Sequence, residues 1–345
     1  MDPVEAVESV FPGEHWQQKK PGEIGLDKVR LKAFRQFVGG RGCVIRKGYL
    51  VYSWGDISRR QDIASAAKPI YSHFLFKAVQ DGRISSLDEK VVKWEPRLQG
   101  LNSALSYKDR LITWRHLANQ TSCYQVGEQP GSAFNYNDWQ MALFWDTLFL
   151  QVYQSSYEEV DEKVFRALLA EPMGCQDEPT MLSFGQQHLP GRVAMSVRDF
   201  ARFGLLYLNQ GKWGDETLID SLYACRAVAD PVAKSVAQSE GQLAEVIAGQ
   251  RTIGSEEVPD NQSDHFGSYS WLWWINGEDR EGQRMFPDAP LDLYGAFGHG
   301  GPRALWVIPS LDMVVCYNGA KMEQWVNGKQ NPTNQAMKLL LEAVE

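Results

Sequence analysis

The sequence predicts a mixed α/β protein (α+β class) in which an antiparallel sheet flanked by helices is built from both ends of the chain. Three β-rich runs support this near the C-terminus, at residues 269–275, 304–308 and 313–317, and one supports it near the N-terminus, at residues 43–55. Helical periodicity dominates the section between them. We therefore expect a single domain with an α/β lobe (1–96 and 266–345) and an inserted, mainly helical lobe (97–265).

Composition limits the possible functions. The 345 residues are 43% hydrophobic and 23% charged, which is enough for a sizeable core. The net charge is −8 and no basic cluster is present, so we do not expect the protein to bind nucleic acid. No apolar run is long enough for a membrane span, and residues 1–5 do not resemble a signal peptide. As given, the chain is expected to be cytoplasmic, or periplasmic or secreted if it has been trimmed.

The five cysteines are odd in number and scattered along the sequence, at positions 43, 123, 175, 225 and 316. They form neither a C-x-x-C pair nor a cluster with histidine. We therefore expect free thiols, no structural zinc and no disulfide framework.

Residues 1–81 are predicted to form an arm, a helix, a hairpin and a second helix. Residues 1–25 are polar and rich in Pro and Gly, and they predict an arm anchored by Phe11 and Trp16. Residues 26–38 predict a helix. Residues 43–55 predict a hairpin with a turn at Lys47 and Gly48, followed by a helix over 65–81.

Ser65 and Lys68 form an S-x-x-K motif at the start of that helix. Residues three apart share one helix face, so the amine can reach the hydroxyl. Pro69 is tolerated because the first helical turn has no acceptor for its missing N–H. Ser65 is a candidate nucleophile and Lys68 a candidate base, although a serine at this place is more often only a helix cap.

The middle of the chain is predicted to be helical. Thr113 is placed to cap a helix, and further helices are expected at residues 139–153, 160–169, 197–208 and 216–228. Residues 231–265 are polar and small without strong periodicity. They predict a long excursion at the edge of a binding cleft.

Two further stretches carry candidate chemistry. Residues 130–138 form a turn followed by Tyr136, a candidate acid/base group; the alternative is that Tyr136 only packs and Asp138 caps a helix starting at Trp139. Residues 297–303 place glycines around His299 ahead of a strand, which permits a close approach of substrate; the alternative is a tight turn. Residues 332–344 predict a closing helix.

In this order, the three stretches resemble the motifs of the serine β-lactamase and penicillin-binding-protein superfamily, which are S-x-x-K, Y-x-N and a K/H-x-G triplet. The resemblance is nearest to the branch of class C-like β-lactamases, DD-peptidases and esterases. Residues 112–117, 130–131, 191–203 and 295–309 are also similar to that branch. A β-lactamase-like fold covering most of the chain is thereby implied.

The resemblance also implies roles for individual residues. Ser65 would be the acylated nucleophile, with Lys68 and Tyr136 moving its proton. No metal or cofactor is implied. The positions implied to contact substrate are Asp138, His299, Gly300, Gly301 and Arg303.

The chain departs from the family pattern at three positions. Asp138 replaces the usual asparagine, and its carboxylate would hold Lys68 charged and move the role of base towards Tyr136, which leaves the base open. Pro302 lacks the N–H that relatives use in the oxyanion hole, so a donor from residues 299–301 would be needed. Cys123 replaces a common glycine, for which we expect an altered cleft wall.

Together these observations predict a cofactor-independent serine hydrolase that forms an acyl-enzyme on Ser65 and acts on small esters or amides. One alternative is a β-lactamase or DD-peptidase acting on β-lactams or peptidoglycan peptides. Another is a binding or sensing domain of the same fold with impaired catalysis.

Overall fold

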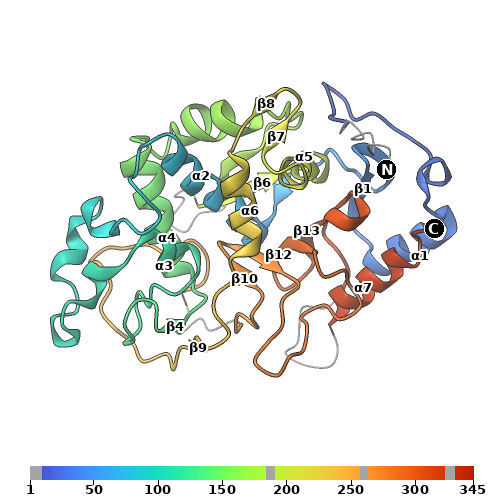
Figure 1. Ribbon diagram of the computed structural model, residues 1–345. Helices are drawn as coiled ribbons and strands as arrows, with labels where there is room; N and C mark the ends of the chain where they lie inside the picture. Colours follow the sequence, from blue (N-terminus) through green and yellow to red (C-terminus); the bar gives the residue numbers. More distant parts are fainter. Residues whose placement is uncertain (1–9, 184–190, 257–262, 323–330) are drawn as a thin grey trace, which may run out of the picture.

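The central feature of the computed structural model is a seven-stranded antiparallel sheet to which both ends of the chain contribute (Figure 1). The structure describes residues 10–183, 191–256, 263–322 and 331–345. The sheet order is β10-β11-β12-β13-β14-β1-β2, with the bounds β1 (Arg41–Arg46), β2 (Tyr49–Trp54), β10 (Tyr269–Ser270), β11 (Trp273–Ile275), β12 (Tyr294–Gly298), β13 (Arg303–Ile308) and β14 (Met313–Asn318). The predicted sheet is therefore confirmed.

The pairing of β1 with β14 joins the two ends of the chain. Val44 pairs with Val315 and Cys43 with Cys316, in antiparallel register. The predicted hairpin is also confirmed, because Lys47 and Gly48 between β1 and β2 both have positive φ.

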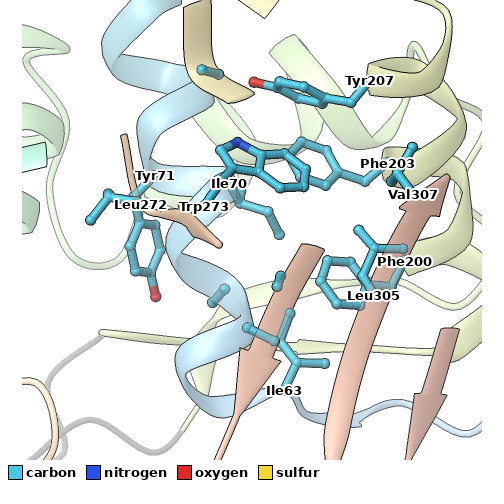
Figure 2. Close-up of a cluster of buried hydrophobic side chains, with 14 of the residues drawn as sticks. Ile63, Ile70, Tyr71, Phe200, Phe203, Tyr207, Leu272, Trp273, Leu305 and Val307 are labelled. Carbon is cyan, nitrogen blue, oxygen red and sulfur yellow. The ribbon is translucent and has the colours of Figure 1, made fainter. Parts of the chain in front are cut away.

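One face of the sheet packs on helix α5 (Val197–Leu208), whose bounds match the predicted helix. Gly204 allows this approach, because a Cβ at that position would come within 2.7 Å of side-chain atoms of Val314 and Leu305. Figure 2 shows the resulting cluster, in which Phe203 stacks on Trp273 with the ring centroids 5.7 Å apart. The cluster also includes Ile63 and Ile70, so it packs against the start of helix α2 (Lys68–Gln80) (Figure 2).

The opposite face is covered by helices α1 (Lys28–Val38) and α7 (Pro332–Leu341), which pack against each other (Figure 1). Phe34 of α1 contacts the rings of Trp54 and Trp306 on this face. Both helices were predicted, and Asp27 caps the first of them.

Apart from α5, the helices between the two sets of strands lie on the side of the molecule away from α1 and α7 (Figure 1). They are α2 (Lys68–Gln80), α3 (Trp114–Ala118), α4 (Asp138–Trp145), two π-helical segments (Asp146–Val152 and Asp161–Ala170) and α6 (Ser221–Ala229). Short 3₁₀ turns occupy Ala64–Ala67, Val91–Lys93, Pro96–Gly100, Ser103–Leu105 and Lys108–Leu111, with two more at Pro21–Ile24 and Pro309–Leu311. The division into two lobes at residues 97 and 265 stays a prediction.

Several expectations were wrong in detail. The helix expected at 216–228 begins only at Ser221, because β7 (Lys212–Trp213) and β8 (Glu216–Thr217) form a hairpin around Gly214. The run 269–275 is two strands rather than one, because Trp271 and Leu272 adopt positive φ and form the turn between β10 and β11.

Other strands had no prediction at all. They are β12, the three-stranded sheet of β3 (Gln61–Asp62), β6 (Arg192–Met195) and β5 (Thr180–Ser183), and the parallel pair of β4 (Ala133–Phe134) and β9 (Ala237–Gln238). Most have only two to four residues, which is too short for a period of two to be recognised.

The N-terminal arm and the cysteines agree with expectation. Phe11 packs on Trp213, and the Trp16 indole donates a hydrogen bond to the Arg198 carbonyl at 3.1 Å. All five cysteines are free. Residues 1–9 of the predicted arm and 257–262 of the predicted excursion lie outside the described residues. Among the helices described, none is both long and apolar enough to cross a membrane.

Candidate active site

Ser65 lies in the 3₁₀ turn Ala64–Ala67, which runs directly into α2. This confirms the helix predicted over 65–81, and Gly82 ends it with φ +69°. Two strands lie against this turn. The Ile63 N–H donates a hydrogen bond to the Val193 carbonyl on β6 at 3.0 Å. Gly298, at the end of β12, is so close that a Cβ on it would come within 2.5 Å of the Ile63 carbonyl oxygen.

Lys68 contacts three of the predicted site residues. Its Nζ donates a hydrogen bond to Ser65 Oγ at 3.0 Å. Asp138 Oδ1 is 3.6 Å from the same Nζ, and the centroid of the Tyr136 ring is 4.5 Å away. Lys68 is only 5% exposed. The structure thus brings together a hydroxyl, an amine, a phenol and a carboxylate that come from two distant parts of the sequence.

Aromatic packing fixes the Tyr136 ring. Its centroid is 6.0 Å from that of Tyr269 and 6.3 Å from that of Trp274, both on the β10–β11 hairpin. The side chain is 5% exposed. The ring therefore has little freedom to turn away from Lys68.

A buried amide network holds the backbone around Tyr136. Asn137, not Asp138, caps α4, because its Oδ1 accepts the Gln140 N–H at 2.8 Å. This corrects the expectation that Asp138 caps a helix starting at Trp139. The Gln140 side chain in turn donates to Gln120 Oε1 at 3.0 Å and accepts from Ser122 Oγ at 2.6 Å.

Asp138 also contacts a segment that the sequence did not connect with it. Its Oδ2 accepts the Ser255 N–H at 2.9 Å, and a Cβ on Gly254 would overlap that oxygen. Arg251 anchors the segment through an ion pair with Asp146 at 2.6 Å. The segment 231–265 therefore contacts Asp138, to which no sequence signal pointed, and its place at the edge of a binding cleft stays a prediction.

The glycine-rich stretch forms the turn that joins β12 to β13. His299, Gly300 and Gly301 all have positive φ. The Gly301 N–H donates to the Gly298 carbonyl at 3.2 Å. Pro302 has no N–H, and within the described parts of the chain neither the His299 N–H nor the Gly300 N–H donates to a backbone carbonyl.

Arg303 contacts His299 directly. Its Nη1 donates to His299 Nδ1 at 2.7 Å, and its Nη2 is 3.9 Å from Asp62 Oδ2. Partial burial, followed by the charge of Arg303, lowers the pKa of His299 below its usual value. The imidazole is therefore neutral at pH 7, with its proton on Nε2, because a guanidinium can only donate.

Cys123 lies behind the site rather than at its surface. The side chain is fully buried, and its Sγ donates to the Ala133 carbonyl at 3.5 Å. Burial raises the pKa of this thiol to about 11. It is therefore a packing residue and a poor nucleophile at neutral pH.

No family model matches the chain, and neither does any curated protein sequence. Many solved structures match its fold. A candidate β-lactamase from Bacteroides dorei has a TM-score of 0.65 at 16% identity, over 92% of this chain and 98% of the other. EstCE1, described as a hydrolase with promiscuous acyltransferase activity, has a TM-score of 0.61 at 13% identity, over 90% and 98%.

A penicillin-binding-protein homologue from Caulobacter crescentus has a TM-score of 0.59 at 12% identity, over 93% of this chain and 99% of the other. At these identities the matches establish the fold. The chain thus has the β-lactamase-like fold that its motifs predicted, over nearly its whole length.

Proposed function

We propose that the protein is a cofactor-independent serine hydrolase that forms an acyl-enzyme on Ser65 and releases it to water. The observation that carries this proposal is the 3.0 Å hydrogen bond between Lys68 Nζ and Ser65 Oγ, in a site where Tyr136 and Asp138 also contact Lys68. A serine hydroxyl needs such a neighbour to lose its proton as it attacks.

In the first half of the reaction, Ser65 Oγ bonds to the carbonyl carbon of the substrate while its proton passes to the Lys68 and Tyr136 pair. The tetrahedral oxyanion accepts hydrogen bonds from the Ser65 N–H and from that of His299 or Gly300. Collapse breaks the bond to the leaving alcohol or amine, which takes up the proton. Water then repeats the sequence on the acyl-enzyme and restores the Ser65 hydroxyl.

Within the pair, we assign the base to Tyr136. Asp138 lies 3.6 Å from Lys68 Nζ, and an opposite charge at this range favours the ammonium form. An ammonium cannot take a proton, which leaves Tyr136, whose ring centroid lies 4.5 Å from Lys68 Nζ, as the group that would accept it. Lys68 would then act as the charged neighbour of Ser65 and Tyr136 rather than as the base.

We further propose that small esters are better substrates than β-lactams. His299 is neutral and its imidazole is turned to Arg303, so it offers no cation to a substrate carboxylate. The Asp138 carboxylate would repel an anionic lactam and cannot donate to an acyl amide. An ester also has the better leaving group, which matters where Pro302 has removed one oxyanion donor.

The test compares kcat/KM for a short-chain p-nitrophenyl ester with kcat/KM for a chromogenic cephalosporin. The Ser65→Ala variant serves as the background for both substrates. We expect Ser65-dependent turnover of the ester that exceeds turnover of the cephalosporin. Faster turnover of the cephalosporin would refute the ester preference while keeping the serine mechanism.

A second candidate function is a binding or sensing domain without turnover. Two observations favour it: Pro302 interrupts the oxyanion turn, and Ser255 and Gly254 close over Asp138. The same assay separates it from the hydrolase, because such a domain would give equal rates with wild type and with Ser65→Ala for every ester tested.

A further inference from the structure

Asp62 is a nearly buried carboxylate three residues before Ser65, at the end of β3. Its Oδ1 accepts the Ala64 N–H at 3.0 Å and the Arg192 Nε–H at 3.2 Å, and its Oδ2 accepts from Arg192 Nη2. Its own carbonyl accepts from Asn318 Nδ2 at 3.2 Å. Asp62 is therefore tied to β6 and β14 as well as to the nucleophile turn.

The contact with Ala64 matters because that residue has a φ of +51°. The left-handed region is unfavourable for a residue with a Cβ, so such a conformation persists only where its surroundings enforce it. The charge-assisted hydrogen bond from the Ala64 N–H to Asp62 is one such constraint. The strained residue directly precedes Ser65, so its backbone sets the direction in which the Ser65 hydroxyl points.

The same carboxylate reaches the opposite side of the site through Arg303. The Arg303 guanidinium spans from Asp62 Oδ2 to His299 Nδ1, at 3.9 and 2.7 Å. The charged groups that act on His299 are Arg303 and Arg192, which lower its pKa, and Asp62 and Asp138, which raise it. Asp62 is the shared anionic partner of the Arg192 and Arg303 guanidinium groups. Removing its carboxylate would leave both positive charges beside the His299 turn without this counter-charge.

We infer that Asp62 is a positioning residue, which fixes the nucleophile turn at Ala64 and, through Arg303, the His299 turn on the other side of the site. This inference rests on the proposed hydrolase function. In this role Asp62 affects the reaction by holding Ser65 and the His299 turn in one fixed arrangement. A rigid arrangement of this kind is what acyl transfer requires, because the nucleophile and the oxyanion donors must face the same carbonyl.

The first test is the Asp62→Asn variant, which keeps the shape of the side chain and an oxygen for the Ala64 N–H but removes the charge. A misplacement of about 1 Å can cost about 100-fold in rate, so we expect a loss of roughly 10 to 100-fold. The loss should appear in kcat for a p-nitrophenyl ester and in the rate of Ser65 labelling by a fluorophosphonate. KM should change by less than about threefold, because no substrate contact is removed.

The matched control is Asp177→Asn. Asp177 forms a similar bidentate pair with Arg198, and the two pairs are buried alike: the carboxylate side chains are 11% and 8% exposed, and both arginine side chains are 26% exposed. We expect Asp177→Asn to lower the melting temperature about as much as Asp62→Asn. Its labelling rate and its kcat should stay within about twofold of wild type.

The second test needs no catalytic turnover. In an ¹⁵N-resolved NMR titration, wild-type His299 should appear as the Nε2–H tautomer, and Arg303→Met should raise its pKa, because a cation is removed. An Nδ1–H tautomer in wild type, or an unchanged pKa in the variant, would overturn the link through Arg303.

Failure of the inference and failure of the proposed function give different results. If wild type is labelled at Ser65 and Asp62→Asn is labelled equally fast, only the inference is refuted, and Asp62 is merely structural. If wild type itself is not labelled, the proposed hydrolase is refuted and the inference falls with it.

Discussion

Lys68 and His73 are ionisable residues on the same helix, α2, and both are almost completely buried, at 5% and 0% exposed. Their surroundings differ. Lys68 contacts the Ser65 hydroxyl at 3.0 Å and the Asp138 carboxylate at 3.6 Å. His73 lies among aromatic rings, and its Nδ1 is 3.4 Å from the Tyr207 hydroxyl.

The difference shows that burial alone does not make a catalytic group. Burial lowers the pKa of His73 to about 3, so the ring is neutral at any physiological pH, and its polar contact among the described residues is the Tyr207 hydroxyl. The start of the same helix supplies Lys68 with a counter-charge and a nucleophile. We therefore expect substitutions at the start of α2 to change activity, and those in its middle to change stability.

The largest expected effect is that of Ser65→Ala, which should reduce ester turnover to the uncatalysed rate. The fold should survive, because the Ser65 hydroxyl caps no helix and its hydrogen bond with Lys68 contributes about 0.5–1.5 kcal/mol of unfolding free energy. Steady-state kinetics and thermal unfolding of the same preparation check both parts. Retained activity in a folded variant would remove Ser65 from the mechanism.

The next effect is that of Tyr136→Phe, which removes the proposed base but keeps the ring beside Lys68. We expect kcat to fall by roughly 100 to 10,000-fold, the usual contribution of a general base. Tyr269→Phe is the matched control, because it is a neighbouring buried tyrosine whose hydroxyl has no hydrogen-bond partner among the described residues. Equal losses in the two variants would mean that the Tyr136 hydroxyl has no chemical role.

A smaller effect is expected for Asp138→Asn, which replaces the carboxylate beside Lys68 with an amide. The amide can donate one hydrogen bond to an acyl-amide carbonyl, and such a bond contributes about 0.5–1.5 kcal/mol. The ratio of kcat/KM for cephalosporin to that for ester should therefore rise about twofold to about thirteenfold. A ratio that falls would show that the carboxylate does not disfavour lactams.

The smallest effect on activity is expected for His73→Phe, which should leave kcat at pH 7 within about twofold. Its effect is on the pH dependence of stability. The pKa of His73 is depressed in the folded state, so only the unfolded chain binds a proton between about pH 6.5 and pH 3. As the pH falls through this window, the free energy of unfolding of wild type should therefore decrease by up to about 1.4 kcal/mol per pH unit.

Because the phenylalanine ring does not titrate, the variant should lack this part of the loss. Denaturant unfolding of both proteins at pH 7, 6, 5 and 4 measures the difference between them. Parallel pH profiles would show that His73 already carries its proton in the folded protein.

The nucleophile side of the site was predictable because its signal is local. The spacing of Ser65 and Lys68 fixes their contact as soon as a helix starts there, and the helical period at 197–208 marks the helix that packs on the sheet. Tyr136 was found by its position before an apolar helix, not by any local geometry.

The other contacts were not predictable, because they join distant segments without a pattern. Nothing in the sequence links Asp138 to Ser255, or Asp62 to Arg192. Strand β12 (Tyr294–Gly298) was missed because two of its five residues are glycine and a third is alanine, which weakens the strand signal. These pairings depend on how the strands assemble, which local propensity does not encode.

The most direct test of the central claim is the intact mass of the protein after reaction with a fluorophosphonate probe. We predict one adduct per chain on wild type, located at Ser65 by peptide mapping, and none on Ser65→Ala. Absence of an adduct on folded wild type, or an adduct that persists in Ser65→Ala, would contradict the assignment of Ser65 as the nucleophile.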